Sequence, residues 1–193
     1  MAGLTRLYTL AILLAGALIV TGCDDQQARS GAPATGGGGA GATAAAAGEA
    51  LPAGLIVAQA PADARGVADV RKVAADGEEV TVRGRIAGST EPFTEGRAQF
   101  QLVDAAIKSC RETEGDACPT PWDMCCEDRK TVAANSLTVQ VAGPDGRPLK
   151  AGLKGVSGLE PLSEVSVQGK VQKSADGKAV TVNATELYVK PQG

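Results

Sequence analysis

Apolar and polar residues alternate in five segments between residues 79 and 189. Successive side chains of a β-strand point to opposite faces of a sheet, so this alternation predicts strands with one buried face. The predicted strands span residues 79–87, 98–103, 136–142, 164–173 and 179–189. Their inward positions are mostly valine and leucine, residue types that suit a compact β-domain. The pattern predicts an all-β fold.

The last two predicted strands carry signals for their connection and for one irregularity. Asp176-Gly177 lies between them and predicts a hairpin turn. In the last strand the inward positions include Val182 but resume at Leu187, so the alternation changes parity midway. A parity change needs an extra residue in one strand, which predicts a β-bulge near Ala184-Thr185.

Helical periodicity is confined to short segments. Val67, Val70 and Val73 recur at helical spacing, and Asp76-Gly77 ends the pattern, so a short helix is expected over residues 66–75. Residues 149–162 have a second apolar period that predicts another short helix, weakened by its glycines.

Two of the strands share the pattern V-x-V-x-G-x-[IV], at residues 80–86 and 165–171. A glycine in mid-strand usually marks a sharp bend or a close backbone approach, as small barrels require. Five strands, a helical element between the third and fourth, and these glycines resemble the OB-fold. Residues 68–86, ADVRKVAADGEEVTVRGRI, are similar to the opening of bacterial OB domains of the tRNA-anticodon-binding type. The resemblance covers about residues 66–190 and implies a small five-stranded β-barrel with one or two short helices.

The N-terminal segment has the features of an export signal. Residues 1–22 contain an apolar run of signal-peptide length, shorter than the roughly 20 residues that span a membrane. The run ends in Val20-Thr21-Gly22-Cys23, which resembles the lipobox of bacterial lipoproteins and implies cleavage before Cys23 and acylation of that cysteine. More than one acyl chain gives stable anchoring. The alternative is an uncleaved anchor with an incidental cysteine.

These patterns divide the chain into consecutive parts. Residues 1–22 are the predicted signal peptide and residues 23–50 a disordered Gly/Ala-rich tether. Residues 51–65 form a lead-in segment, and residues 66–190 form the OB-like domain. Within that domain, residues 105–131 form a cysteine-rich insert between the second and third strands.

The insert contains Cys110, Cys118, Cys125 and Cys126. An even number of cysteines in an exported protein favours disulfides, with Cys110 and Cys118 each bonding one of the adjacent pair. Two alternatives stay open. The four thiolates are potential ligands of zinc or another soft metal, although no C-x-x-C spacing occurs, and a redox-active pair is the other.

Composition excludes several functions. The chain has no histidine, which excludes nucleophiles activated by histidine and every histidine-containing metal site. The formal net charge is −3, and an acidic protein is a poor general ligand of polyanions. Nucleic acid is therefore disfavoured as a partner, and no catalytic residues are assigned.

The OB resemblance implies a ligand face on the second and third strands and the loops beside the barrel mouth. The outward residues there are Gln99, Gln101, Thr138 and Gln140, together with Phe93 in the first hairpin loop as the one candidate for base stacking. Trp122 in the insert is either a packing residue or an exposed contact, and packing is favoured.

The sequence therefore predicts a non-enzymatic, membrane-anchored binding or assembly module that faces the periplasm or the exterior of a bacterial cell. Its partners would be membrane lipid through acylated Cys23, and an envelope protein or a small polar ligand. No cofactor is expected. The alternatives are a metal-binding or thiol redox protein and, by fold analogy alone, a single-stranded nucleic-acid binder.

Overall fold

The structure is a computed structural model that describes residues 48–192. Its elements in chain order are β1 (Arg65–Gly66), α1 (Val67–Val73), β2 (Glu79–Ile86), β3 (Gln99–Val103), a 3₁₀ turn (Cys110–Glu112), α2 (Arg129–Ala134), β4 (Ser136–Gln140), a second 3₁₀ turn (Val156–Gly158), β5 (Glu164–Lys173) and β6 (Val180–Val189). The predicted signal peptide, Cys23 and residues 23–47 of the predicted tether lie outside the described residues. No helix in the described part of the chain is long and apolar enough to cross a membrane.

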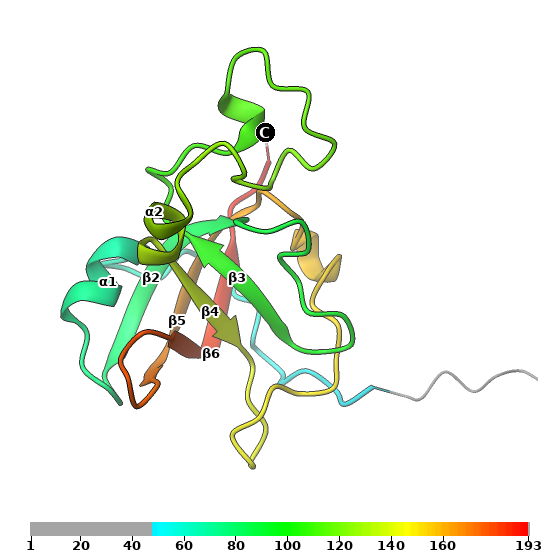
Figure 1. The fold of residues 1–193 in the computed structure, drawn as a ribbon. Coiled ribbons are helices and arrows are strands. Elements are labelled where there is room, and N and C mark those ends of the chain that lie inside the picture. The colour runs from blue at the N-terminus through cyan, green and yellow to red at the C-terminus, as the bar shows by residue number, and fades with distance from the viewer. Residues whose placement is uncertain (1–47, 193) are drawn as a thin grey trace, which may run out of the picture. The chain divides into compact units, whose positions relative to one another are not determined.

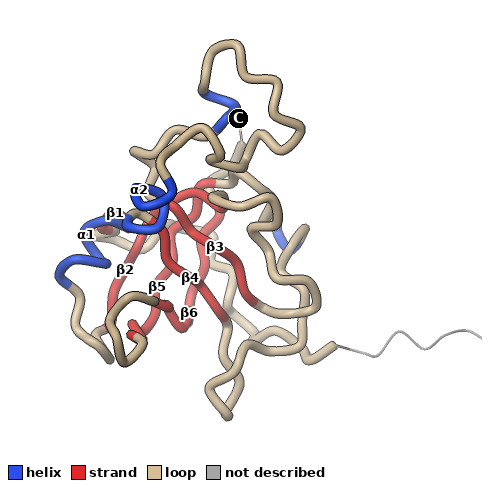
Figure 2. Tube along the Cα trace, in the orientation of Figure 1, coloured by secondary structure: helices blue, strands red, loops and turns tan. Residues whose placement is uncertain are grey.

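Five strands close into a small OB-like barrel (Figures 1 and 2). β2 pairs with β3 and β3 with β4, both antiparallel, and β4 then pairs with β6 in parallel. β6 pairs with β5, and β5 returns to β2 to close the ring. The two-residue strand β1 adds to β2 outside the ring. The predicted fold class and all five predicted strands are confirmed.

Alternation along the strands places the core as expected. Val82 and Ile86 on β2 and Phe100 on β3 are almost completely buried, while Arg83 between the first two is exposed. Leu153 and Leu159, from the segment between β4 and β5, are also buried in this core.

The two mid-strand glycines occupy sites where the backbones approach closely. A Cβ on Gly84 would lie 2.5 Å from the carbonyl oxygen of Val103, and a Cβ on Gly169 would meet the backbone of Asn183. Beside Gly169 the register with β6 shifts: Gln168 lies opposite Glu186, whereas Gly169 lies opposite Ala184. Thr185 is the extra residue, so the predicted bulge is confirmed.

The helices agree only in part with the sequence. α1 confirms the first helix, but Val73 is 66% exposed, so the buried face consists of Val67, Val70 and Ala74. The second predicted helix is wrong: residues 149–162 contain only a 3₁₀ turn, because Gly155 and Gly158 both adopt a φ of +85°, which an α-helix cannot contain. α2 was not predicted; the carboxylate of Asp128 caps it by accepting hydrogen bonds from the N–H groups of Lys130 and Thr131.

The lead-in segment packs on the barrel. Leu55 is buried, and its carbonyl accepts a hydrogen bond from the N–H of Leu187 in β6 (2.7 Å). The N–H of Val57 donates to the carbonyl of Leu187 (2.9 Å). Even within the predicted tether, the N–H of Glu49 bonds the carbonyl of Lys150 (3.0 Å). The packed part of the chain therefore begins before the domain boundary expected at residue 66.

The cysteine-rich insert projects beyond one end of the barrel, at the top of Figure 1. It is almost entirely loop (Figure 2). A small apolar cluster lies under its base and contains Ala87, Val103, Met124 and Val132. The insert is thus joined to the barrel by a satellite core of its own.

Candidate functional sites: a polar groove and a thiol cluster

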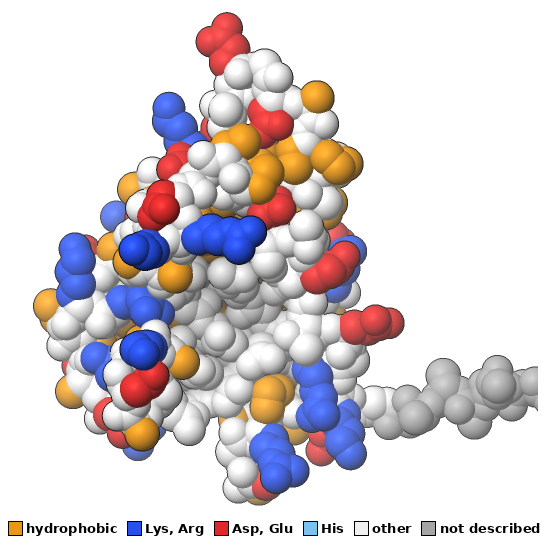
Figure 3. All heavy atoms as spheres, viewed as in Figure 1, with side chains coloured by type: hydrophobic (Ala, Val, Ile, Leu, Met, Phe, Trp, Pro, Cys, Tyr) orange, Lys and Arg blue, Asp and Glu red, His pale blue; other side chains and the backbone are white. Residues whose placement is uncertain are grey.

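A groove of about 620 Å³ lies on the outer face of β3 and β4. Its floor includes the outward side chains of Gln99, Gln101 and Thr138, and the register of the two strands places Gln101 directly opposite Thr138. The groove is bounded by α1, α2, the loop between β2 and β3, and the turn between β5 and β6. In Figure 3 it is a hollow with a largely white floor, meaning uncharged polar side chains and backbone.

The floor of the groove can both donate and accept hydrogen bonds. Thr94 donates its hydroxyl hydrogen to the side-chain oxygen of Gln99 (3.1 Å). The side chains of Gln101 and Thr138 make no hydrogen bond with another described residue. An amide and a hydroxyl therefore remain available to a polar ligand.

Arg71 on α1 brings positive charge to one wall of the groove. Its guanidinium donates to the carbonyl oxygens of Ser136 (2.6 Å) and Lys178 (2.8 Å), and thus connects α1 to β4 and to the β5–β6 turn. Partial burial lowers the pKa of Arg71, which stays charged at neutral pH. Glu91 lines the groove from the β2–β3 loop, so the wall carries both signs of charge.

The structure brings together three of the residues that the sequence assigned to a ligand face. Gln99, Gln101 and Thr138 share the groove, but Gln140 does not: it is 6% exposed, and its amide donates to the side-chain oxygen of Asn183 (2.7 Å). Phe93 packs against the buried ring of Phe100, with centroids 5.8 Å apart. Gln140 is therefore not a free contact residue, and Phe93, the expected base stacker, is partly buried against the core.

Sequence reasoning missed Arg71, Lys178 and the α2 residues Ala133 and Ala134 in the groove wall. No local pattern indicates them, because only the barrel topology brings α1 and the β5–β6 turn beside β4.

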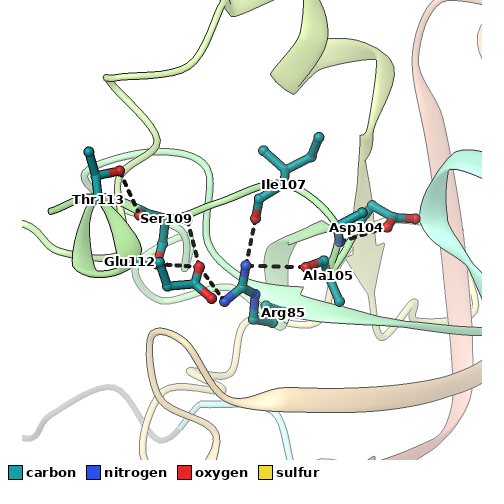
Figure 4. A network of polar contacts seen from close by, with 8 residues as sticks. Arg85, Asp104, Ala105, Ile107, Ser109, Glu112 and Thr113 are labelled. Atoms are coloured by element: carbon teal, nitrogen blue, oxygen red, sulfur yellow. Dashed lines mark hydrogen bonds and ion pairs between the residues drawn. The ribbon is translucent and has the colours of Figure 1, made fainter.

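Arg85 on β2 holds the base of the insert (Figure 4). Its guanidinium lies 2.7 Å from the carboxylate of Glu112 and donates to the carbonyl of Ile107 (2.5 Å). The same carboxylate oxygen accepts hydrogen bonds from the N–H (2.8 Å) and the hydroxyl (3.0 Å) of Ser109. Partial burial alone would raise the pKa of Glu112, but the hydrogen bonds from Ser109 and Arg85 hold it below the usual value. On the neighbouring strand β5, Glu164 lies opposite Arg85, whereas Lys170 lies opposite Glu79.

Trp122 joins the insert to the β2–β3 loop. Its indole N–H donates to the carbonyl of Thr90 (2.9 Å), and its own carbonyl accepts the N–H of Gly88 (3.1 Å). The side chain is half-buried. These contacts agree with the packing interpretation of Trp122.

The sulfur atoms of Cys110, Cys118 and Cys125 converge inside the insert. The Cys125 sulfur lies 3.4 Å from that of Cys110 and 3.9 Å from that of Cys118, and all three sulfurs lie within 4.8 Å of one another. The sulfur of the neighbouring Cys126 also lies within 4.8 Å of the Cys110 sulfur, and its thiol donates to a carboxylate oxygen of Asp116 (3.2 Å).

The environments of the four thiols differ. Cys110 is buried, and this burial raises its pKa to about 11. The hydrogen bond to Asp116 raises the pKa of Cys126 to about 11, and hydrogen bonds with Thr120 lower the pKa of Cys118. All four are free thiols here, whereas a disulfide would bring two sulfurs to about 2.05 Å. The two predicted disulfides stay a prediction.

Comparison with protein-family models finds no match, and comparison with curated proteins finds none either. Among solved structures, the chain is similar to the hypothetical protein ygiW from E. coli, with 15% identity over 66% of this chain and 89% of that one. The TM-score is 0.36. The fold assignment rests on the strand order and register of this chain itself.

Proposed function

We propose that this protein is a non-enzymatic binding module of a bacterial cell envelope. Acylated Cys23 anchors it to a membrane, and the polar groove on β3 and β4 holds a small polar ligand or a segment of another envelope protein. The groove and the anchor have separate tests.

The convergence of Gln99, Gln101 and Thr138 in one groove carries the binding proposal. OB-folds bind ligands on this face of the barrel and between the adjacent loops. The volume of about 620 Å³ is within the range of small-molecule sites. Amide and hydroxyl groups orient a polar ligand by hydrogen bonds, but they neither titrate near neutral pH nor act as nucleophiles without a nearby base. This chemistry favours binding over catalysis.

The same groove does not favour nucleic acid. Base stacking needs aromatic rings on the surface, and Phe100, the aromatic residue among those that line the groove, is 1% exposed. Salt-sensitive binding of a single-stranded oligonucleotide to the purified protein would support the nucleic-acid alternative instead.

Photocrosslinking tests the groove in cells that produce the full chain. A photoreactive amino acid replaces Thr138 on the groove floor, and in the control it replaces Gln168, which points outward on β5 away from the groove. We expect an adduct of defined mass at position 138 and none at position 168. No adduct at 138, or equal adducts at both positions, would contradict the assignment of the groove.

The membrane anchor has its own assay. Labelled fatty acid should be incorporated into the native chain and not into the Cys23→Ser variant, because the acyl chains attach at Cys23. Absence of label from the native chain, or recovery of the protein in the cytosol, would refute the envelope assignment.

A further inference from the structure

The outer part of the insert has almost no apolar burial. No residue from 111 to 121 is buried. Two hydrogen bonds join its arms: the N–H of Cys110 to the carbonyl of Asp123, and the N–H of Arg111 to the carbonyl of Pro121, both at 3.1 Å. Ordering a loop of this kind costs about 1–2 kcal/mol per residue in backbone entropy alone. A cross-link would offset this cost, and the thiols are the groups in this region that can form one.

The sulfurs of Cys110, Cys118 and Cys125 all lie within 4.8 Å of one another at the centre of the insert. Cys110 begins the 3₁₀ turn, Cys118 comes from the outer loop, and Cys125 precedes α2. Cys125 contacts both of the others, yet a disulfide can join it to only one. One ion bound between the three sulfurs accounts for all three positions.

The spacing of the sulfurs fits a thiolate metal site. Sulfur ligands about 2.3 Å from a zinc ion lie about 3.8 Å apart in a tetrahedron and about 4.0 Å apart in a planar triangle. The two contacts of Cys125, 3.4 and 3.9 Å, require only small adjustment of exposed loop side chains to reach these values.

We propose that Cys110, Cys118 and Cys125 bind one soft metal ion of the Zn²⁺ class as three thiolates, and that this ion cross-links the insert. Each thiol releases its proton when its sulfur bonds the metal, so binding of one ion releases up to three protons. Three protein ligands leave a fourth position open to water or an exogenous ligand. Cys126 is left out of the ligand set because its thiol donates to Asp116, although its sulfur also lies within 4.8 Å of the Cys110 sulfur. This site is separate from the groove and does not depend on the function proposed for it.

Metal titration of the full chain tests the proposal. The protein is purified in detergent under reducing conditions, stripped of metal with a chelator, and titrated with Zn²⁺ alone while native mass spectrometry reports the stoichiometry. Co²⁺ serves as a spectroscopic probe, since thiolate ligation gives sulfur-to-metal charge-transfer absorption. We expect one ion per chain and the loss of three reactive thiols on binding.

Serine variants assign the ligands. Cys110→Ser, Cys118→Ser and Cys125→Ser should each weaken Zn²⁺ binding by more than the 10–100-fold typical of outer-shell changes. The matched control Cys126→Ser should weaken binding by no more than that 10–100-fold, because its sulfur is an outer-shell group at most. Cys118→Ser and Cys125→Ser are the sharpest variants, since neither side chain is buried, and circular dichroism can verify that the barrel is intact.

Three outcomes would overturn the proposal. The reduced chain does not bind Zn²⁺; or Cys126→Ser weakens binding as much as the other variants; or the protein isolated from cells without reductant carries two disulfides and no metal, in which case the cross-link is covalent.

Discussion

Replacement of Gly169 by alanine should destabilise the whole barrel. A Cβ at this position would lie 2.8 Å from the carbonyl carbon of Asn183 and 2.9 Å from the Cα of Ala184, and closer still to the carbonyl oxygen of Asn183. All three atoms are backbone of β6, the strand hydrogen-bonded to β5 at this point. No side-chain rotation relieves the contact, so the two strands must separate beside the bulge.

The expected loss of stability is at the upper end of the range for overpacking, about 3 kcal/mol. For a domain of this size that corresponds to a fall in melting temperature of roughly 10 °C. Gly152→Ala is the matched control, because a Cβ there meets nothing within 4 Å and the backbone needs no positive φ. The control should stay within about 0.5 kcal/mol of the native protein.

Urea unfolding followed by far-ultraviolet circular dichroism measures both free energies of unfolding. If Gly169→Ala and Gly152→Ala unfold with the same free energy, the close approach of β5 and β6 at Gly169 is refuted.

The other predictions concern the insert and the ion pairs. Arg85→Gln removes a charge-assisted contact with Glu112. Because the Glu112 side chain is 45% exposed, the insert should lose only about 1 kcal/mol of stability, and proteolysis within it should be faster. An unchanged rate of cleavage would contradict the anchoring role of Arg85. Hydrogen bonds from the N–H of Ala75 and from the side chain of Arg65 lower the pKa of Glu78 in the folded chain. The Glu78 carboxylate therefore stabilises the folded state above pH 4.5, its ordinary pKa, and this stabilisation is lost as the pH falls through the lower folded pKa. The free energies of unfolding of the native chain and Glu78→Gln should therefore differ at neutral pH and converge in acid, whereas a constant difference would be inconsistent. Trp122→Phe removes one hydrogen bond to the β2–β3 loop and should weaken docking of the insert by about 1 kcal/mol, measured as increased hydrogen exchange at the N–H of Gly88; equal protection would argue against the contact.

Strand periodicity was enough to predict the five strands of the barrel and the β-bulge in the last of them. The parity change between Val182 and Leu187 indicated the bulge, because an extra residue is the way for a strand to restore its inward face. Helices were less predictable: α2 is six residues long with Val132 as its buried residue, too few to establish an apolar period.

The candidate sites depend on contacts between residues distant in the sequence. Strand parity placed Gln101 and Thr138 on the outer face, but it could not show that Gln140 is held by Asn183 of β6. That contact exists because β4 and β6 are neighbouring strands of the barrel that pair in parallel. Likewise, cysteine spacing allowed disulfides, a metal site or a redox pair, and only the folded loop shows Cys125 between two other sulfurs.

The position of β6 between β4 and β5 determines when the molecule can fold during its synthesis. The ring stays open until the ribosome has added Val189, since β6 supplies the partner of both neighbouring strands. A chain without β6 lacks the strand that pairs with both β4 and β5. Most contacts of the finished barrel join residues far apart in sequence, which makes folding slow. The barrel therefore folds as one unit after its last strand has been synthesised, and not strand by strand.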